Sequence, residues 1–124
     1  MNSALQQTPL WRDSTRLVVL MEEAVRTFPK YHKYALGADL RRQAIGVCRL
    51  ILRAYSARND RQKQLERLIV AVDDLKLLIQ LAKEVKAFKS FNQFQVIAEL
   101  SVGVGRQSGS WLKRSRSEAS SSNR

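Results

Sequence analysis

The chain has 124 residues, 44% of them hydrophobic, with 22 lysines and arginines against 11 aspartates and glutamates, which gives a formal charge of +11. This length suits one domain with a real core, and the charge indicates a polyanionic partner, either nucleic acid or an anionic membrane surface. No apolar run approaches the roughly 18 residues that span a bilayer, and the polar residues 1–7 do not resemble a signal peptide, so we expect a cytoplasmic protein.

Residues 10–28 are predicted to form the first helix of an antiparallel, up-down four-helix bundle. Their apolar side chains recur at spacings of three, four and seven, which places them on one face of a helix. Pro9 suits the first turn of this helix, and Pro29 lies just beyond its end. The polar residues before it, 1–9, are expected to be a flexible lead-in.

A basic, aromatic connection, Lys30–Leu36, follows the first helix. Tyr31 and Tyr34 lie among lysines there, where they either pack over the end of the bundle or stack with nucleic-acid bases. His32 is the only histidine of the chain, so metal binding and histidine-based acid–base catalysis have little support.

Residues 36–58 are predicted to form the second helix. Its apolar stripe consists of Leu36, Leu40, Ala44, Val47, Ile51 and Ala54. Arg42, Arg49 and Arg53 lie almost opposite that stripe, and three unpaired arginines in register suit a polyanion laid along them. The open alternative is an ordinary solvated face. The single cysteine, Cys48, is expected to be a small buried hydrophobe and not a nucleophile.

Residues 60–87 are predicted to form a third helix that is apolar on two faces. One stripe consists of Leu65, Leu68, Val72, Leu75, Ile79 and Ala82. Val70, Leu77 and Leu81 form another stripe roughly 140° away. A helix of an isolated bundle needs only one apolar stripe, so the second stripe predicts self-association.

Residues 90–110 are predicted to form the fourth helix. Its inward stripe consists of Phe91, Phe94, Ile97, Ser101, Val104 and Ser108. Gly103 and Gly105 are expected to allow close approach by a neighbouring backbone. The bundle is expected to span 10–112, and the basic, serine-rich residues 113–124 are expected to be disordered until something binds them. This tail is either an electrostatic contact for RNA or a solubilising terminus.

Four stretches carry a resemblance that covers most of residues 12–114. Phe28-Pro29-Lys30 and Tyr34-x-Leu36-Gly37-x-x-Leu40-Arg41 resemble the small four-helix-bundle proteins encoded in intervening sequences of bacterial large-subunit ribosomal RNA genes. Leu75–Lys86 and Gly105–Lys113 are similar to one branch of that family, the accessory variability determinant proteins of phage and bacterial diversity-generating retroelements. The glycine, tryptophan and lysine of the last stretch are the more specific motif, because the ribosomal branch usually lacks them.

The resemblance implies a ring-shaped homo-oligomer, typically a pentamer, with a positively charged surface and a central channel. It also implies binding to the element's reverse transcriptase and to its template RNA, with DNA or an RNA–DNA hybrid as further ligands. Such a protein would support cDNA synthesis and mutagenic retrohoming in the cytoplasm of a bacterial host. The two-faced third helix and the arginine face agree with that picture.

The resemblance marks Arg41 and Arg106 as family-typical basic residues, and the other candidates come from the helical wheel and the tail. The candidate contacts to nucleic acid or reverse transcriptase are Arg41, Arg42, Arg49, Arg53, Arg58, Arg106, Lys113, Arg114 and Arg116. The candidate oligomer contacts are Val70, Leu77 and Leu81. At Gln93–Gln95 and Val102–Val104 the sequence departs from the family pattern, so no family contact is assigned there.

Other classes of function have less support. Phosphate-binding glycine loops, cysteine pairs of zinc spacing and serine-nucleophile motifs are missing from the sequence, so we expect no enzyme, catalytic residue, metal or cofactor. The alternative that remains open is an oligomeric scaffold with a protein partner and incidental charge. Salt separates the two, because phosphate binding weakens steeply with ionic strength and an apolar contact does not. Anionic lipid ranks last, since no helix pairs a lysine-rich face with exposed Trp or Phe.

Overall fold

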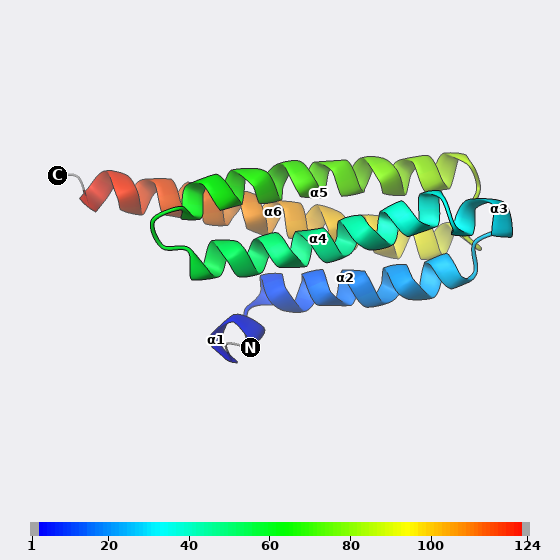
Figure 1. Ribbon diagram of the computed structural model, residues 1–124, viewed down its shortest axis with the longest axis horizontal. Coiled ribbons are helices and arrows are strands. Elements are labelled where there is room, and N and C mark those ends of the chain that lie inside the picture. Colours follow the sequence, from blue (N-terminus) through cyan, green and yellow to red (C-terminus); the bar gives the residue numbers. More distant parts are fainter. Residues whose placement is uncertain (1–2, 123–124) are drawn as a thin grey trace.

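The computed structural model describes residues 3–122, and all its regular elements are helices (Figure 1). Four long helices form an up-down bundle: α2 (Pro9–Arg26), α4 (Leu36–Ser56), α5 (Arg61–Glu84) and α6 (Phe91–Ser122). Two short helices, α1 (Ser3–Gln6) and α3 (Lys30–Lys33), precede α2 and α4. The prediction of an all-α helical bundle is confirmed.

The four long helices occupy the corners of a square. Helix α4 packs against α2 and α5, and α6 packs against the same two neighbours, so α4 and α6 stand at diagonal corners. The core between them contains the predicted stripes of α4 and α5, with Leu36 only partly buried. On α6, Phe94, Ile97 and Val104 are buried, whereas Phe91 is exposed and does not belong to the inward stripe.

Local sequence explains where α2 begins. The Thr8 hydroxyl oxygen accepts a hydrogen bond from the backbone nitrogen of Trp11 at 3.2 Å, which satisfies one of the free amide groups at the helix start. Pro9 takes the first helical position, where its missing N–H costs nothing. Helix α2 ends at Arg26, two residues before the predicted end, and Pro29 begins the turn into α3.

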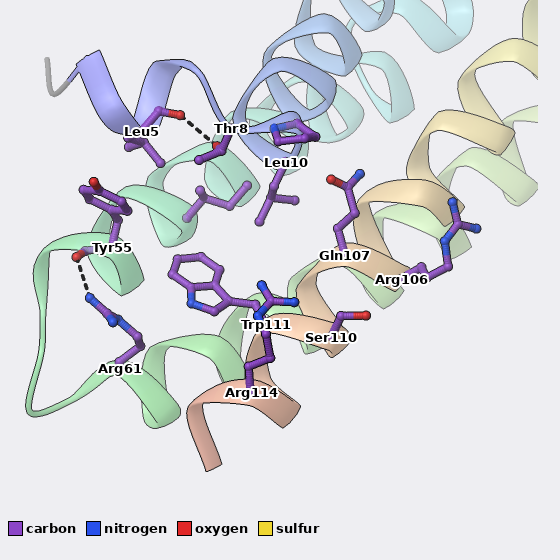
Figure 2. A pocket seen from close by; sticks show the side chains of 12 residues that line it. Leu5, Thr8, Leu10, Tyr55, Arg61, Arg106, Gln107, Ser110, Trp111 and Arg114 are labelled. Atoms are coloured by element: carbon purple, nitrogen blue, oxygen red, sulfur yellow. Dashed lines mark hydrogen bonds between the residues drawn. The ribbon is translucent and has the colours of Figure 1, made fainter. Parts of the chain in front are cut away.

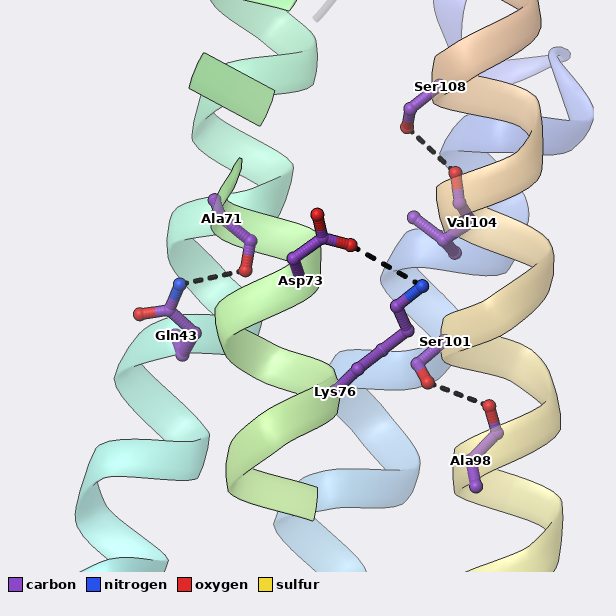
Figure 3. A network of polar contacts seen from close by, with 8 residues as sticks. All are labelled: Gln43, Ala71, Asp73, Lys76, Ala98, Ser101, Val104 and Ser108. Carbon is purple, nitrogen blue, oxygen red and sulfur yellow. Dashed lines mark hydrogen bonds and ion pairs between the residues drawn. The ribbon is translucent and has the colours of Figure 1, made fainter. Parts of the chain in front are cut away.

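Buried serines and one glycine allow α6 to pack closely. The Ser101 and Ser108 hydroxyls donate to the carbonyls of Ala98 and Val104, each at 2.7 Å, so both polar groups are satisfied within α6 (Figure 3). A Cβ at Gly105 would lie 3.3 Å from Cγ1 of Val72 on α5. The expected close approach is therefore found at Gly105.

The other predicted glycine, Gly103, has no such neighbour. A Cβ at Gly103 would meet only the side chain of Arg106, at 3.9 Å. Neighbouring helices therefore come close at Gly105 alone of the two glycines. On the side of α5 that faces α4, the Gln43 amide donates to the carbonyl of Ala71 at 2.9 Å (Figure 3).

The expectation of a flexible lead-in at 1–9 is wrong for residues 3–9, and residues 1–2 lie outside the described part. Ser3–Gln6 form α1, and Leu5 is only 1% exposed because it packs into the core cluster. The Thr8 hydroxyl donates to the carbonyl of Leu5 at 2.7 Å. Tertiary burial of one leucine thus orders a segment whose local sequence is polar.

The expectation of a disordered tail at 113–124 is wrong for residues 113–122, which continue α6 beyond the ends of α4 and α5 (Figure 1). Residues 123–124 lie outside the described part. Leu112 is buried, and no glycine or proline follows Gly109, so nothing stops the helix there. Arg116 also pairs with Glu66 of α5 at 3.1 Å. Among the described helices, none combines the length and apolar character needed to cross a bilayer.

Candidate nucleic-acid interface

The arginine row lies on the outer surface of α4. Arg42, Arg49 and Arg53 are all exposed. They stand opposite the buried side of the same helix, which includes Leu40, Ala44, Val47, Ile51 and Ala54. Helical geometry therefore puts three guanidinium groups along one line of the surface, with the core holding the other face of α4 in place.

The ion pairs differ from the sequence expectation of three unpaired arginines. Arg42 pairs with Asp39, one turn earlier on α4. Arg49 and Arg53 have no ion pair or side-chain hydrogen bond among residues 3–122. An exposed pair such as Arg42–Asp39 contributes about 0–1 kcal/mol, so Asp39 competes weakly with a phosphate for Arg42.

Arg41 and Arg58 differ from the row in their surroundings. Arg41 donates from Nε to Oε1 of Glu22 on α2 at 2.7 Å, so it ties α4 to α2 and is partly neutralised. Arg58 lies beyond the end of α4 and is exposed. It lines an open, mostly polar depression, also of about 570 Å³, with Lys63 of α5 and Glu118 of α6.

The cations of α6 form a separate group. Lys113, Arg114 and Arg106 are exposed, and the structure gives them no ion pair within the described residues, whereas Arg116 is paired with Glu66. Because α4 and α6 stand at diagonal corners, the outward-facing arginine row of α4 and these cations lie on different sides of the bundle. The predicted residues therefore form two main basic areas, while Arg41 is paired with Glu22 of α2 and Arg58 lies beside the end of α6.

A pocket of about 570 Å³ lies where α6 passes the ends of α2, α4 and α5 (Figure 2). Its lining combines the aromatic residues Tyr55 and Trp111, aliphatic side chains of α1, α2 and α4, and three arginines. The arginines are Arg61, Arg106 and Arg114. Figure 2 shows the guanidinium of Arg114 beside the indole, whereas that of Arg106 points away from it. Of these, Arg106 and Arg114 were candidates from the sequence, and Arg61 was not.

Arg61 is the residue of this candidate site that sequence reasoning missed. Its Nε and Nη2 donate to the carbonyls of Ala54 and Tyr55 at 2.8 and 2.9 Å, which satisfies two free carbonyls at the end of α4. Figure 2 shows the bond to Tyr55. Its guanidinium carbon also lies 5.9 Å from the ring centroid of Trp111. The available signal was an arginine in the first turn of the predicted third helix, directly after the turn that joins it to the arginine helix.

The second apolar stripe of α5 is on the surface. Val70, Leu77 and Leu81 are 60%, 57% and 44% exposed. They lie on the face of α5 opposite Leu68, Val72 and the rest of the buried stripe. A surface helix in a monomeric bundle would carry polar side chains at these positions.

Two aromatic side chains of the basic connection are also on the surface. Tyr31 and Tyr34 are 87% and 73% exposed, so they do not pack over the end of the bundle. Nζ of Lys33 lies 5.8 Å from the ring centroid of Tyr34. The sequence left two roles open for these tyrosines, and their exposure is compatible with the second, stacking with nucleic-acid bases.

Features that would indicate catalysis are few. Burial raises the pKa of the Cys48 thiol, and the Ser14 side chain lowers it in part, so Cys48 is less ionised than an exposed cysteine. Within residues 3–122, no three histidine, cysteine or acidic side chains gather as a metal site. The chemistry that the surface offers is binding by cations, aromatic rings and apolar side chains.

The comparisons with known proteins assign the chain to a family. The model of the bAvd-like family matches residues 11–115, which include all four long helices apart from the first residues of α2 and the last turns of α6. No curated protein matches the chain at a significant level. The matched range also includes the arginine row, the exposed stripe of α5 and Trp111, whereas the pocket residues Leu5, Thr8, Pro9 and Leu10 precede it. The chain therefore belongs to the bAvd-like family of accessory variability determinant proteins.

Proposed function

We propose that this chain is a non-enzymatic accessory subunit of a diversity-generating retroelement, and that it binds the element's reverse transcriptase and template RNA. In this role it supports cDNA synthesis and mutagenic retrohoming. DNA and RNA–DNA hybrids present the same phosphate chemistry and are further ligands. Membership of the accessory family supports the role, and the charge of +11 supports a polyanionic partner.

One observation carries the nucleic-acid part of the proposal. Arg49 and Arg53 are exposed on the same outer face of α4, and no carboxylate among the described residues neutralises them. Arg42 continues the row and gives up only a weak surface pair when a phosphate replaces Asp39. When a row of guanidinium groups binds a nucleic acid, the counterions condensed on the nucleic acid are released, and this release favours binding.

Self-association is the second part of the proposal. Val70, Leu77 and Leu81 form an exposed apolar line on α5, and a second copy of the chain would cover it. We propose a ring-shaped homo-oligomer, with five subunits as the expected number. In this arrangement α5 lies at the interface between subunits, and the arginine row on the neighbouring helix α4 stays available for RNA.

The experiment compares two charge-reversed proteins. Arg49→Glu with Arg53→Glu is measured against wild type for binding of a fluorescently labelled, structured RNA by anisotropy. Arg16→Glu with Arg26→Glu is the matched control, because both of its arginines are exposed on α2 and away from the row. The α4 variant is expected to lose RNA binding, whereas the α2 control keeps most of it because its α4 row is intact. Both variants have the same net charge, so a difference between them reports the position of the arginines.

Circular dichroism and light scattering accompany the binding measurement. Helicity and oligomer size should be unchanged in both variants, since the four arginines are exposed and outside the α5 stripe. Equal loss in the two variants would mean that net charge and not the α4 row governs binding. If the wild-type protein does not bind RNA but is oligomeric, the scaffold with a protein partner is favoured instead.

A further inference from the structure

The pocket at Trp111 has the size and lining of a small-ligand site. Its volume of about 570 Å³ lies in the range of roughly 300–1,000 Å³ that such pockets occupy. Figure 2 shows the indole of Trp111 projecting into it, with Leu5 and Leu10 above and Arg114 beside it. The burial of Leu5, at 1% exposure, shows that α1 forms one fixed wall.

The charged groups of this pocket are all cationic. Arg61, Arg106 and Arg114 line it, and no carboxylate of residues 3–122 does. The lining residue Gln107 donates from its amide to the carboxylate of Asp13 at 2.8 Å, and Asp13 itself does not line the pocket. The site therefore complements an anion, and a ligand does not have to displace an existing ion pair to reach the arginines.

The three arginines divide into one that is fixed and two that are available. Arg61 donates hydrogen bonds from Nε and Nη2 to the carbonyls of Ala54 and Tyr55, and its guanidinium lies over the ring of Trp111. Arg106 and Arg114 are exposed and make no hydrogen bond or ion pair to the described residues. The fixed guanidinium holds the indole in place, and the other two can bind phosphate oxygens in the bidentate geometry that guanidinium favours.

An aromatic wall beside free guanidinium groups fits a ligand that has both a planar ring and a phosphate. We propose that this pocket binds one nucleotide of a single-stranded nucleic acid, with the base against Trp111, its own phosphate at Arg114 and a neighbouring phosphate of the strand at Arg106. The inference rests on the proposed function and deepens it, because it separates a base-binding site on α6 from the phosphate-binding row on α4. Stacking on an aromatic ring accepts any base, so the site gives affinity and position and not sequence specificity.

Fluorescence of Trp111 tests this site directly. The chain has two tryptophans, so Trp11→Phe leaves Trp111 as the only reporter. This protein is titrated with a hexamer of adenylate, with the deoxy form of that hexamer, and with an abasic sugar–phosphate hexamer of the same charge. The adenylate hexamers should quench the fluorescence saturably, and the abasic hexamer should bind roughly tenfold more weakly with little quenching. The ribose and deoxyribose forms show which of the two nucleic acids the pocket prefers.

Variants link the signal to the lining. Arg106→Gln with Arg114→Gln in the Trp11→Phe protein should weaken quenching by about tenfold or more, and Arg16→Gln with Arg26→Gln should leave it unchanged. Trp111→Leu keeps an apolar side chain but removes the ring, and it should lower hexamer affinity measured by anisotropy while a thermal melt shows a folded bundle. Abasic and adenylate hexamers that bind and quench equally would overturn the inference.

Two further results distinguish this inference from the proposed function. Structured RNA that binds the α4 row while the adenylate hexamers leave Trp111 fluorescence unchanged would overturn the pocket and leave the proposed function intact. Quenching by oligoglutamate as strong as by adenylate would show a site for acidic peptides and would also overturn base recognition. If neither the structured RNA nor the hexamers bind, both proposals fail together.

Discussion

The guanidinium of Arg61 lies 5.9 Å from the ring centroid of Trp111, which links the first turn of α5 to the C-terminal part of α6. The same guanidinium donates to the carbonyls of Ala54 and Tyr55 at the end of α4. One side chain therefore connects three helices where the connection between α4 and α5 reverses the chain direction. It also fixes one wall of the pocket.

Replacing Arg61 should destabilise this end of the bundle. Arg61→Ala removes two hydrogen bonds from a charged donor and leaves two carbonyls of α4 without that partner, so we expect the free energy of unfolding to fall by about 1.5–3 kcal/mol. Arg67→Ala is the control, because Arg67 is an exposed arginine of the same helix and should change stability by less than about 0.5 kcal/mol. Urea unfolding followed by circular dichroism measures both. Equal stabilities of the two variants would contradict the role given to Arg61.

Two glycines of α4 should respond in opposite directions to alanine. A Cβ at Gly37 would lie 2.7 Å from Cγ1 of Val25. Val25 is buried and β-branched, so it cannot turn away easily, and Gly37→Ala should destabilise the bundle by about 1–3 kcal/mol. A Cβ at Gly46 meets nothing within 4 Å, so Gly46→Ala should stabilise by up to about 1 kcal/mol. Thermal melts compare them, and a shift in the same direction for both would refute the steric argument.

Cys48 should react slowly with alkylating reagents. Burial raises the pKa of its thiol, so at any pH below that value the folded protein holds less thiolate than the unfolded protein, and the thiolate is the reactive form. For the same reason its contribution to stability is present at low pH and is lost as the pH rises through the folded pKa. Iodoacetamide labelling at pH 8, followed by mass spectrometry with and without urea, should show faster labelling in urea. Equal rates would contradict the burial effect.

The Ser14 side chain lowers the pKa of Cys48 in part. Ser14→Ala should therefore slow the labelling of the folded protein further while leaving the rate in urea unchanged.

The exposed stripe of α5 should control oligomer size. Leu77→Glu places a charge in a line of apolar side chains, so the oligomer should dissociate, and helicity should persist because Leu77 is outside the core. Gln80→Glu adds the same charge at another exposed position of α5 and should leave the oligomer intact. Multi-angle light scattering is expected to give five subunits for wild type and the control. A wild-type monomer would mean that the stripe serves another partner.

The periodicity of apolar residues in the sequence predicted the helices that have long apolar stripes. The stripes of α4 and α5 were placed correctly from spacing alone, because burial of one helix face dominates the energetics of a bundle. The exposure of Val70, Leu77 and Leu81 also followed from the wheel, since a helix has room for one buried stripe against its neighbours. Their role as an interface stays a prediction.

Features that depend on contacts between distant segments were not predictable. Helix α1 exists because Leu5 inserts into the core, and its polar sequence carries no periodic signal. The tail was expected to be disordered from its composition, but Leu112 and the Arg116–Glu66 pair hold its start against the bundle. The pocket combines side chains of five helices, so the sequence supplied Arg106 and Arg114 without showing that Arg61 and Tyr55 lie beside them.

The salt dependence of RNA binding is the most direct test of phosphate recognition by the α4 row. Affinity for a structured RNA is measured from low to high salt for wild type, for Arg49→Gln with Arg53→Gln, and for Arg16→Gln with Arg26→Gln. If both α4 arginines contact phosphates, the log–log slope of their variant should be shallower than that of wild type by about 1.4–1.8, while the α2 control keeps the wild-type slope. Equal slopes in all three proteins would show that the row does not bind phosphate.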